Sequence, residues 1–316
     1  MKTLIFGFSV TGEPDGFVER CSQLCPEHEI FKVAIGGLQP DQGWHLIPGI
    51  IRRHRPDALI IEEATAIYRK RPETPDLISD HTSALEHVFR VCRELGVRVG
   101  FLDLRLSGVD ENSDWLLALH TGLSEKYGVP HIALPLDENL LRDIVHTNEE
   151  GKDAYAAALK QLIGEIASSE TDFTELGIGR GFEAFSMEEL EVPEGSFGEF
   201  SRTGLTVKLL ELPEGKACKV VLPETVTISG FIMTMGPTTG DLVFDLGETQ
   251  ASLHCYDRHC YYLRLSGKPI APTEVGEFTV RQGSALPQDE LLKGEKNLAP
   301  RVGGLAYVLF KTTADI

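Results

Sequence analysis

Short apolar runs alternate with amphipathic stretches through the first 166 residues of the chain. Five runs are apolar enough for buried strands, and they span residues 4–8, 30–35, 58–61, 97–102 and 132–134. Between these runs, apolar residues recur three or four positions apart, as they do on one face of a helix. Strands that alternate with helices predict a parallel sheet covered on both faces. This half therefore predicts a flavodoxin-like three-layer α/β sandwich.

Glycine and polar residues indicate where some of these helices begin and end. Gly96 and Gly128 each follow an apolar helical pattern, and both are expected to stop a helix. The last helix of this half carries a stripe from Tyr155 to Ile166. Thr147 with Glu150 fits a capping box at its start.

The pattern changes after Ser168-Ser169-Glu170. Seven short β-rich runs follow, separated by segments rich in glycine, proline, aspartate and threonine. These runs span residues 205–212, 217–222, 225–233, 242–246, 260–265, 278–281 and 305–311. They predict an antiparallel β-sandwich or jelly roll. With the boundary near residue 172, we expect an α/β domain over residues 1–172 and a β domain over residues 173–316.

The charge balance excludes some classes of partner. Asp and Glu number 48 against 30 Lys and Arg, which leaves a formal net charge of -18. Nucleic acids and anionic membrane surfaces both require a basic face, so neither is an expected partner. The first apolar run ends at Thr11, too early for a signal peptide, and no apolar stretch is long enough to span a membrane. We therefore expect a cytoplasmic protein whose six scattered cysteines are reduced.

Several polar residues follow predicted strands of the α/β half. Ser9 follows the first strand, Gly36 the second and Thr65 the third, while Asp143 and His146 follow the fifth. The carboxyl ends of parallel strands meet at one edge of a sheet, so these residues are expected to converge.

Their chemistry fits nucleophilic catalysis. A serine hydroxyl needs a base to accept its proton, and a neutral imidazole serves near pH 7. Asp143, three residues before His146, can fix the tautomer of that imidazole. Backbone N–H groups of Ser9, at an expected helix start, and of Gly36 can stabilise an oxyanion. A serine in such a turn is more often only a helix cap, and an Asp-x-x-His pair is more often only solvated. Their combination in this chain order favours a hydrolase site.

Residues 1 to about 166 resemble the SGNH (GDSL-type) hydrolase superfamily. The family's first block, usually GDSxTxG, corresponds to GFSVTG and places the nucleophile at Ser9. Its second block contributes an oxyanion-hole glycine, which corresponds to Gly36 in VAIGG. Its last block is an Asp-x-x-His pair followed by an asparagine and a glycine, which match Asp143, His146, Asn148 and Gly151. The resemblance implies a Ser-His-Asp triad that needs no metal or cofactor.

Two positions depart from the family pattern. The aspartate of the first block is replaced by Phe8. The third block, usually Gly-x-Asn-Asp, aligns with residues 64–67, which read Ala-Thr-Ala-Ile. The asparagine that donates to the oxyanion is therefore missing, and loss of such a donor costs on the order of a hundredfold in rate. Thr65 is the nearest candidate for a replacement donor.

Other polar clusters carry weaker signals. His254-Cys255 and His259-Cys260 contain ligand types that zinc prefers, but adjacent residues of a strand point to opposite faces. We expect these cysteines to pack in a β core and predict no metal site. Glu62 and Glu63 could form a second acid pair, although one of two neighbours at a strand end is expected to face solvent.

These observations predict a serine esterase that hydrolyses acyl esters, with an acetylated carbohydrate or another small ester as substrate. An O-acyltransferase could use the same three residues. A binding protein with a degenerate site, in which the β domain recognises a glycan or a partner, is the third alternative. Self-association through the β domain is a further expectation.

Overall fold

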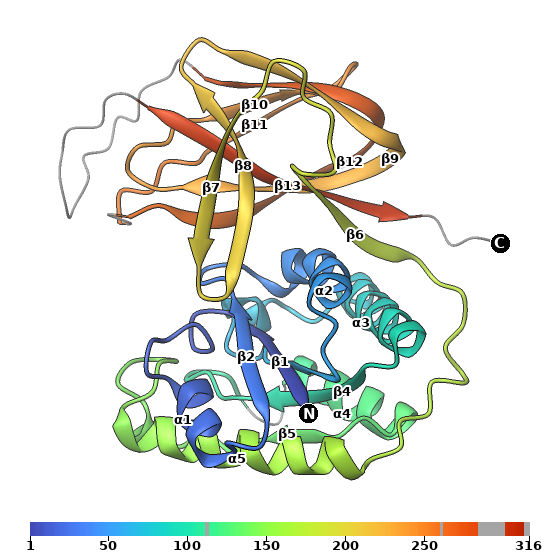
Figure 1. Cartoon of the computed structure of the whole chain (residues 1–316), viewed down its shortest axis with the longest axis vertical. Helices are drawn as coiled ribbons and strands as arrows, with labels where there is room; N and C mark the ends of the chain where they lie inside the picture. The colour runs from blue at the N-terminus through green and yellow to red at the C-terminus, as the bar shows by residue number, and fades with distance from the viewer. Residues whose placement is uncertain (111–113, 260–261, 284–300, 313–316) are drawn as a thin grey trace. The chain divides into compact units, whose positions relative to one another are not determined.

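The computed structural model describes the whole chain except residues 111–113, 260–261, 284–300 and 313–316. Its described residues divide into two compact units (Figure 1). One unit comprises Met1–Gly181 with Thr203–Leu205, and the other comprises Phe182–Arg202 with Thr206–Thr312. The first is an α/β unit and the second a β unit, so the predicted fold class is confirmed.

Five parallel strands form the sheet of the α/β unit. They are β1 (Lys2–Gly7), β2 (Glu29–Ala34), β3 (Ala58–Ile61), β4 (Arg98–Asp103) and β5 (His131–Ala133). Their order in the sheet is β2-β1-β3-β4-β5, and the pairings are parallel. Each strand overlaps a run predicted from the sequence.

Helices cover both faces of this sheet. They are α1 (Phe17–Leu24), α2 (Pro40–His54), α3 (Pro75–Leu95), α4 (Trp115–Tyr127) and α5 (Glu149–Ser168). In Figure 1, α1 and α5 lie on one face, and α2 and α3 lie on the other. The predicted stops at Gly96 and Gly128 are confirmed, because both residues cap helices in the left-handed conformation, with φ of 68° and 63°.

Alternation along the central strands supplies an apolar surface to both helical layers. Ile5 and Ile60 belong to the core cluster that includes residues of α1 and α5. Leu4 and Leu59, their neighbours in sequence, are equally buried and point to the opposite face. Both faces of the strands are therefore apolar, as is typical of parallel sheets.

The start of α5 differs from the prediction. The N-cap is Asn148, whose side chain accepts a hydrogen bond from the Gly151 backbone N–H at 2.9 Å. Thr147 is buried instead, and its hydroxyl donates to Glu13 Oε2 at 3.2 Å. The capping box predicted from Thr147 and Glu150 is therefore wrong, because a tertiary partner takes the threonine hydroxyl.

The described residues of the β unit form eight strands in one sheet. Their order is β11-β10-β12-β9-β13-β8-β7, and β6 pairs with β13. The strands are β6 (Gly181–Ser186), β7 (Ser196–Arg202), β8 (Leu205–Pro213), β9 (Ala217–Met235), β10 (Leu242–Asp245), β11 (Gln250–Leu253), β12 (Arg264–Gln282) and β13 (Val302–Thr312). Two runs predicted separately, 217–222 and 225–233, form the single strand β9. The predicted run 260–265 begins outside the described residues.

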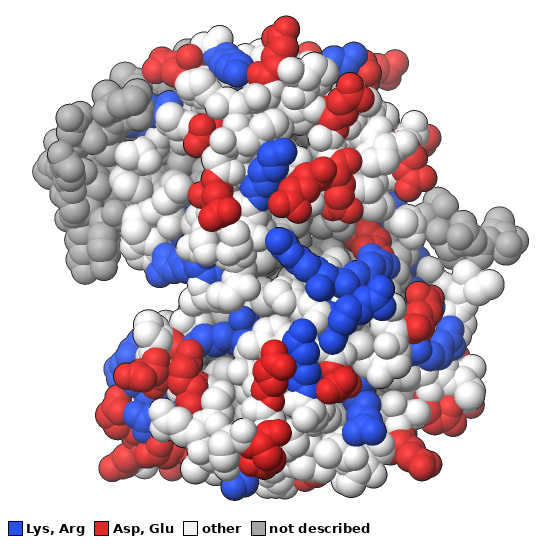
Figure 2. All heavy atoms as spheres, in the orientation of Figure 1, with Lys and Arg blue, Asp and Glu red and all other residues white. Residues whose placement is uncertain are grey.

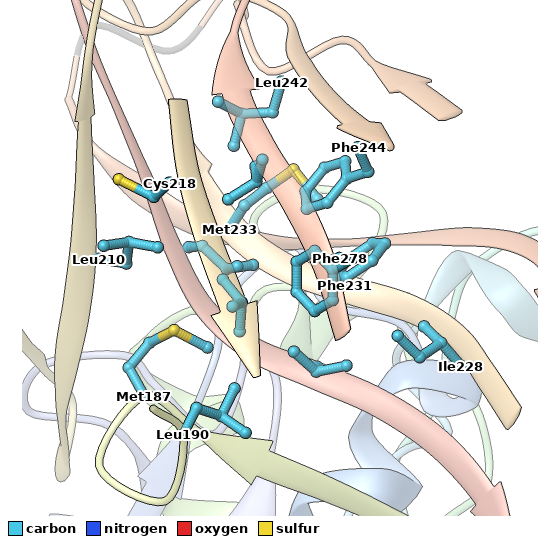
Figure 3. Packing of buried hydrophobic residues seen from close by; sticks show 14 of the residues in the cluster. Met187, Leu190, Leu210, Cys218, Ile228, Phe231, Met233, Leu242, Phe244 and Phe278 are labelled. Atoms are coloured by element: carbon cyan, nitrogen blue, oxygen red, sulfur yellow. The ribbon is translucent and has the colours of Figure 1, made fainter. Parts of the chain in front are cut away.

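Buried apolar residues of the described β strands pack into a core (Figure 3). Phe231 of β9 stacks on Phe244 of β10 with ring centroids 3.9 Å apart. Cys255 is buried in this core, whereas the exposed His254 bonds Asp241 Oδ1 through Nδ1 at 2.6 Å. The predicted packing of Cys255 into a β core is confirmed, and its neighbour points away from that core. Cys260 lies outside the described residues.

The described surface carries charges of both signs, and the described cysteines lie in the interior. Acidic side chains occur over most of the face in Figure 2, with basic side chains among them. The five cysteines within the described part of the chain are free thiols, and all are buried. None of the described helices combines the length and apolar character needed to cross a membrane.

Replacing Asn148 by alanine removes the cap of α5. We expect Asn148→Ala to lower the free energy of unfolding by about 1 kcal/mol, since an amide donor at the helix start loses its partner. Urea unfolding measures the change. The control is Glu150→Ala, which should cost at most about half as much, through the helix dipole alone. Equal losses in the two variants would contradict the observed cap.

Candidate active site

The structure brings the three predicted catalytic side chains together in the α/β unit. Ser9 Oγ lies 3.2 Å from His146 Nε2. On the other side of the ring, His146 Nδ1 lies 2.9 Å from Asp143 Oδ2 and 3.1 Å from Oδ1. The His146 side chain is 28% exposed, so a solute can approach the hydroxyl and the ring from solvent. This order of contacts lets an imidazole accept the hydroxyl proton while a carboxylate holds its other nitrogen.

Asp143 is held in its charged form by local donors. Its Oδ1 accepts hydrogen bonds from the backbone N–H groups of Val145 at 2.9 Å and His146 at 2.8 Å. Partial burial alone would raise the pKa of Asp143, but these backbone bonds and the His146 ring outweigh it and lower the pKa. The carboxylate thus stays ionised near neutral pH and favours the tautomer with its proton on Nδ1.

The segment that carries Asp143 and His146 is a closed loop. Leu141 and Thr147 face one another in an antiparallel bridge at its base. The backbone N–H of Arg142 donates to the His146 carbonyl at 2.8 Å. Such closure limits the positions that the ring of His146 can adopt.

Glu13 joins this loop to the turn that carries Ser9. Its side chain is buried, forms an ion pair with Arg142 and accepts a hydrogen bond from Thr147. Arg142 and Thr147 flank the Asp143–His146 pair on either side. Glu13 therefore holds the base beside the nucleophile. Sequence analysis missed this residue, because a glutamate in a loop gives no local sign of a partner more than a hundred positions away.

Ser9 lies in a turn between β1 and α1, and the structure corrects its predicted place at a helix start. The Gly12 N–H donates to the Phe8 carbonyl at 2.9 Å within this turn, whereas α1 begins only at Phe17. Gly36 is adjacent, since a Cβ built on it would lie 3.7 Å from Ser9 Cβ. The structure thus brings Gly36 to the nucleophile, as the sequence predicts for an oxyanion-hole residue.

Thr65, the predicted replacement donor, is engaged by a buried carboxylate. Its hydroxyl and backbone N–H donate to Glu62 Oε1 at 2.9 and 3.3 Å. The other oxygen of Glu62 accepts from the Thr11 hydroxyl at 2.8 Å. Glu62 therefore links the turn after β1 to the segment after β3, which in the resembling family are the first and third blocks.

Both carboxylates after β3 are buried, so the expectation that one faces solvent is wrong. Glu62 and Glu63 are each 0% exposed. They point to opposite sides, since Glu62 contacts Thr11 and Glu63 contacts His81 on α3. Burial raises the pKa of Glu62 to about 7, although the three hydrogen bonds that it accepts oppose the shift.

A buried arginine also holds the segment after β3 in place. The buried Arg69 donates to the carbonyls of Ala64 and Leu104, both at 3.1 Å. An ion pair with the buried Asp114 neutralises the guanidinium. These bonds hold residues 64–66 in place without the residues usual for the family.

Comparison with known proteins finds similarity in structure. Two solved structures of a two-domain esterase active on acetylated mannans, one co-crystallised with mannopentaose, match 100% of this chain and 92% of their own. Their TM-scores are 0.63 and 0.62, at 12% and 13% sequence identity. An acetyl xylan esterase matches 52% of this chain and 100% of its own, with TM-score 0.44 and 15% identity. No family model and no curated protein matches the sequence. The predicted fold, an α/β unit followed by a β unit, is thus shared with a solved two-domain esterase.

The raised pKa of Glu62 predicts how stability depends on pH. The folded state holds this proton more tightly than the unfolded chain, so the contribution of Glu62 to stability is greatest below about pH 4.5 and falls as pH rises through 7. Glu62→Gln stays neutral throughout, and the Thr11 hydroxyl can accept as well as donate. Between pH 5 and 8 we expect the variant to gain about 2 to 3 kcal/mol in unfolding free energy relative to wild type.

Urea unfolding of both proteins at the two pH values measures this difference. The matched control is Glu94→Gln on α3, an exposed position, where the difference from wild type should change much less. A Glu62→Gln difference that is the same at both pH values would contradict the assignment.

Proposed function

We propose that the chain is a serine esterase that hydrolyses acyl esters, foremost acetyl esters, of a carbohydrate or another small molecule. The observation that carries this proposal is the 3.2 Å separation of Ser9 Oγ and His146 Nε2, with Asp143 at the other ring nitrogen. The shared fold of an esterase active on acetylated mannans supports the proposed class of substrate.

In the proposed acylation step, Ser9 Oγ attacks the carbonyl carbon of the ester while its proton passes to His146 Nε2. The tetrahedral intermediate then collapses, and the bond to the alcohol oxygen breaks. That oxygen takes the proton from Nε2 and leaves as a neutral alcohol. Asp143 stabilises the imidazolium that exists between the two proton transfers.

Water completes the cycle. It gives a proton to Nε2 of His146 while its oxygen attacks the acyl carbon. Collapse of the second intermediate returns the proton to Ser9 Oγ and releases the carboxylic acid. This sequence uses only side chains of the α/β unit and consumes one ester and one water.

We assign the oxyanion to the backbone N–H groups of Ser9 and Gly36, because a Cβ built on Gly36 would lie 3.7 Å from Ser9 Cβ. Thr65 is proposed to act indirectly, because its hydroxyl and N–H already donate to Glu62. The missing asparagine then implies slower turnover than in an enzyme with a complete set of donors.

Ester hydrolysis by the full chain tests the proposal. We expect wild type to release acetate from p-nitrophenyl acetate and from acetylated manno-oligosaccharides, and Ser9→Ala to lose at least about a thousandfold in kcat. Ser22→Ala on α1 is the matched control and should retain activity, because its hydroxyl only bonds the Val18 carbonyl. A fluorophosphonate probe should label Ser9. Equal rates for wild type and Ser9→Ala would refute an esterase.

An acceptor distinguishes hydrolysis from acyl transfer. If acetate is released only slowly in water while an acetylated product accumulates with a sugar acceptor, the same three residues serve an acyltransferase. Self-association through the β unit and a cytoplasmic location stay predictions, and light scattering of the full chain checks the first.

Glu13 provides a test of positioning. We expect Glu13→Ala to lower kcat by roughly tenfold to a hundredfold with little change in KM, because the loop that carries His146 loses its link to the turn of Ser9. Glu13→Gln, which can still accept from Thr147, should retain more activity. Arg142→Ala removes only the ion pair, in which the arginine side chain is half exposed, and keeps the bond from Thr147 to Glu13, so it should have the smallest effect. Wild-type kcat in folded Glu13→Ala would rule out the positioning role.

A further inference from the structure

A second cluster of polar side chains is buried in the α/β unit, away from the Ser9 contacts. It consists of Glu63 after β3, His81 on α3 and His120 on α4, and all three are 0% exposed. Glu63 Oε1 lies 2.6 Å from His81 Nε2 and 3.0 Å from His120 Nε2. These three atoms lie within 4.8 Å of one another. Two imidazole nitrogens and a carboxylate oxygen therefore converge on one point in the interior.

A fourth residue sets the orientation of one ring. Asp103 at the end of β4 lies 2.8 and 3.0 Å from His120 Nδ1 through its two oxygens. This bond assigns a proton to Nδ1, so the neutral ring directs the lone pair of Nε2 at Glu63 Oε1. A carboxylate behind a histidine in this way is the usual support of a metal-bound imidazole. Asp103 also bonds His131 Nε2 at 2.8 Å, which fixes the carboxylate itself.

The ring of His81 is held by packing and meets polar atoms through one nitrogen. Its centroid lies 4.4 Å from Trp44, 5.8 Å from Tyr68 and 5.6 Å from Trp115. Within the described part of the chain, Nδ1 of His81 is buried without a hydrogen-bond partner. The polar contact of this ring is therefore made by Nε2, which points at Glu63 Oε1.

A proton or a metal ion must lie between Glu63 Oε1 and each Nε2, since a lone pair that faces a carboxylate oxygen is repelled. One proton on each ring nitrogen or a single metal ion can meet this need. With neutral imidazoles, Glu63 and Asp103 leave two formal negative charges in a site closed to water, which is unfavourable without compensation. A divalent cation balances both charges with a single atom. Ligands of zinc in a tetrahedron lie roughly 3.3 Å apart, so the 2.6 and 3.0 Å contacts of Glu63 Oε1 need to open by less than 1 Å to admit the ion.

We propose that Glu63 Oε1, His81 Nε2 and His120 Nε2 bind a divalent transition-metal ion of the zinc type. Two imidazoles and one carboxylate suit zinc and its first-row neighbours, whereas calcium and magnesium prefer oxygen ligands alone. The ligands join β3, α3 and α4 behind the segment that carries Thr65, so the ion serves structure and not ester chemistry. This inference does not rest on the proposed esterase activity.

Metal analysis of the full chain, purified without chelator, gives the first measurement. We expect about one zinc-type ion per chain by mass spectrometry. After removal with a chelator, Co²⁺ should restore one equivalent and give a visible absorption band from its nitrogen and oxygen ligands. Zn²⁺ added to the metal-free protein should raise its Tm, because the ion binds the folded state.

Variants locate the site. Glu63→Gln and His120→Gln should each lower the affinity for Co²⁺ at least about tenfold and abolish the absorption band. The matched control is His254→Gln in the β unit, an exposed histidine that also bonds an aspartate, and it should bind as wild type does. The metal analysis uses wild-type protein, so the proposal can still be tested if a variant fails to fold.

Two outcomes would overturn the proposal. The first is wild-type protein that purifies without metal, binds no Co²⁺ and keeps its Tm when Zn²⁺ is added, which would assign two protons to the cluster. The second is metal binding that folded Glu63→Gln and His120→Gln leave unchanged, which would place the ion elsewhere.

Discussion

The contact between Ser9 Oγ and His146 Nε2 is the interaction on which the functional interpretation depends. It joins residues 137 positions apart, so the chain must close a long loop before either side chain gains a partner. The parallel sheet brings the two side chains near one another, because β1 and β5 end at the same edge. Glu13 and the closed loop from Leu141 to Thr147 then set the final distance.

Glu62 and Glu63 show how two adjacent residues can serve opposite sides of one sheet. A strand directs successive side chains to opposite faces, so Glu62 meets the hydroxyls of Thr11 and Thr65 while Glu63 meets two imidazoles. A buried carboxylate is costly unless donors surround it, and each of these has them. Glu62 thus joins the turn that carries Ser9 to the segment after β3. It lies outside the two motifs that these segments match in the resembling family.

Sequence patterns predicted the α/β half well. Buried strands in a parallel sheet are apolar on both faces, so runs such as 58–61 stand out without any knowledge of neighbours. Helix stops at Gly96 and Gly128 are local, because only the backbone conformation of one residue decides them. Asn148 replaced Thr147 as the cap of α5, since a hydroxyl with two possible partners takes the one that the tertiary fold supplies. In the β unit, strands β6, β7 and β11 are mostly half-buried or exposed and left no apolar run to find.

By itself the sequence determined the two kinds of unit, the strand order in the chain, and the residue types and order of Ser9, Asp143 and His146. Those features follow from periodicity and from short motifs, which are properties of neighbouring residues. Tertiary structure decided which carboxylates are buried, that Glu13 supports the base, that Thr65 donates to Glu62, and that His81 and His120 meet Glu63. Each of these depends on side chains brought together across loops of tens of residues, and no local pattern records which of several polar residues will be the partner.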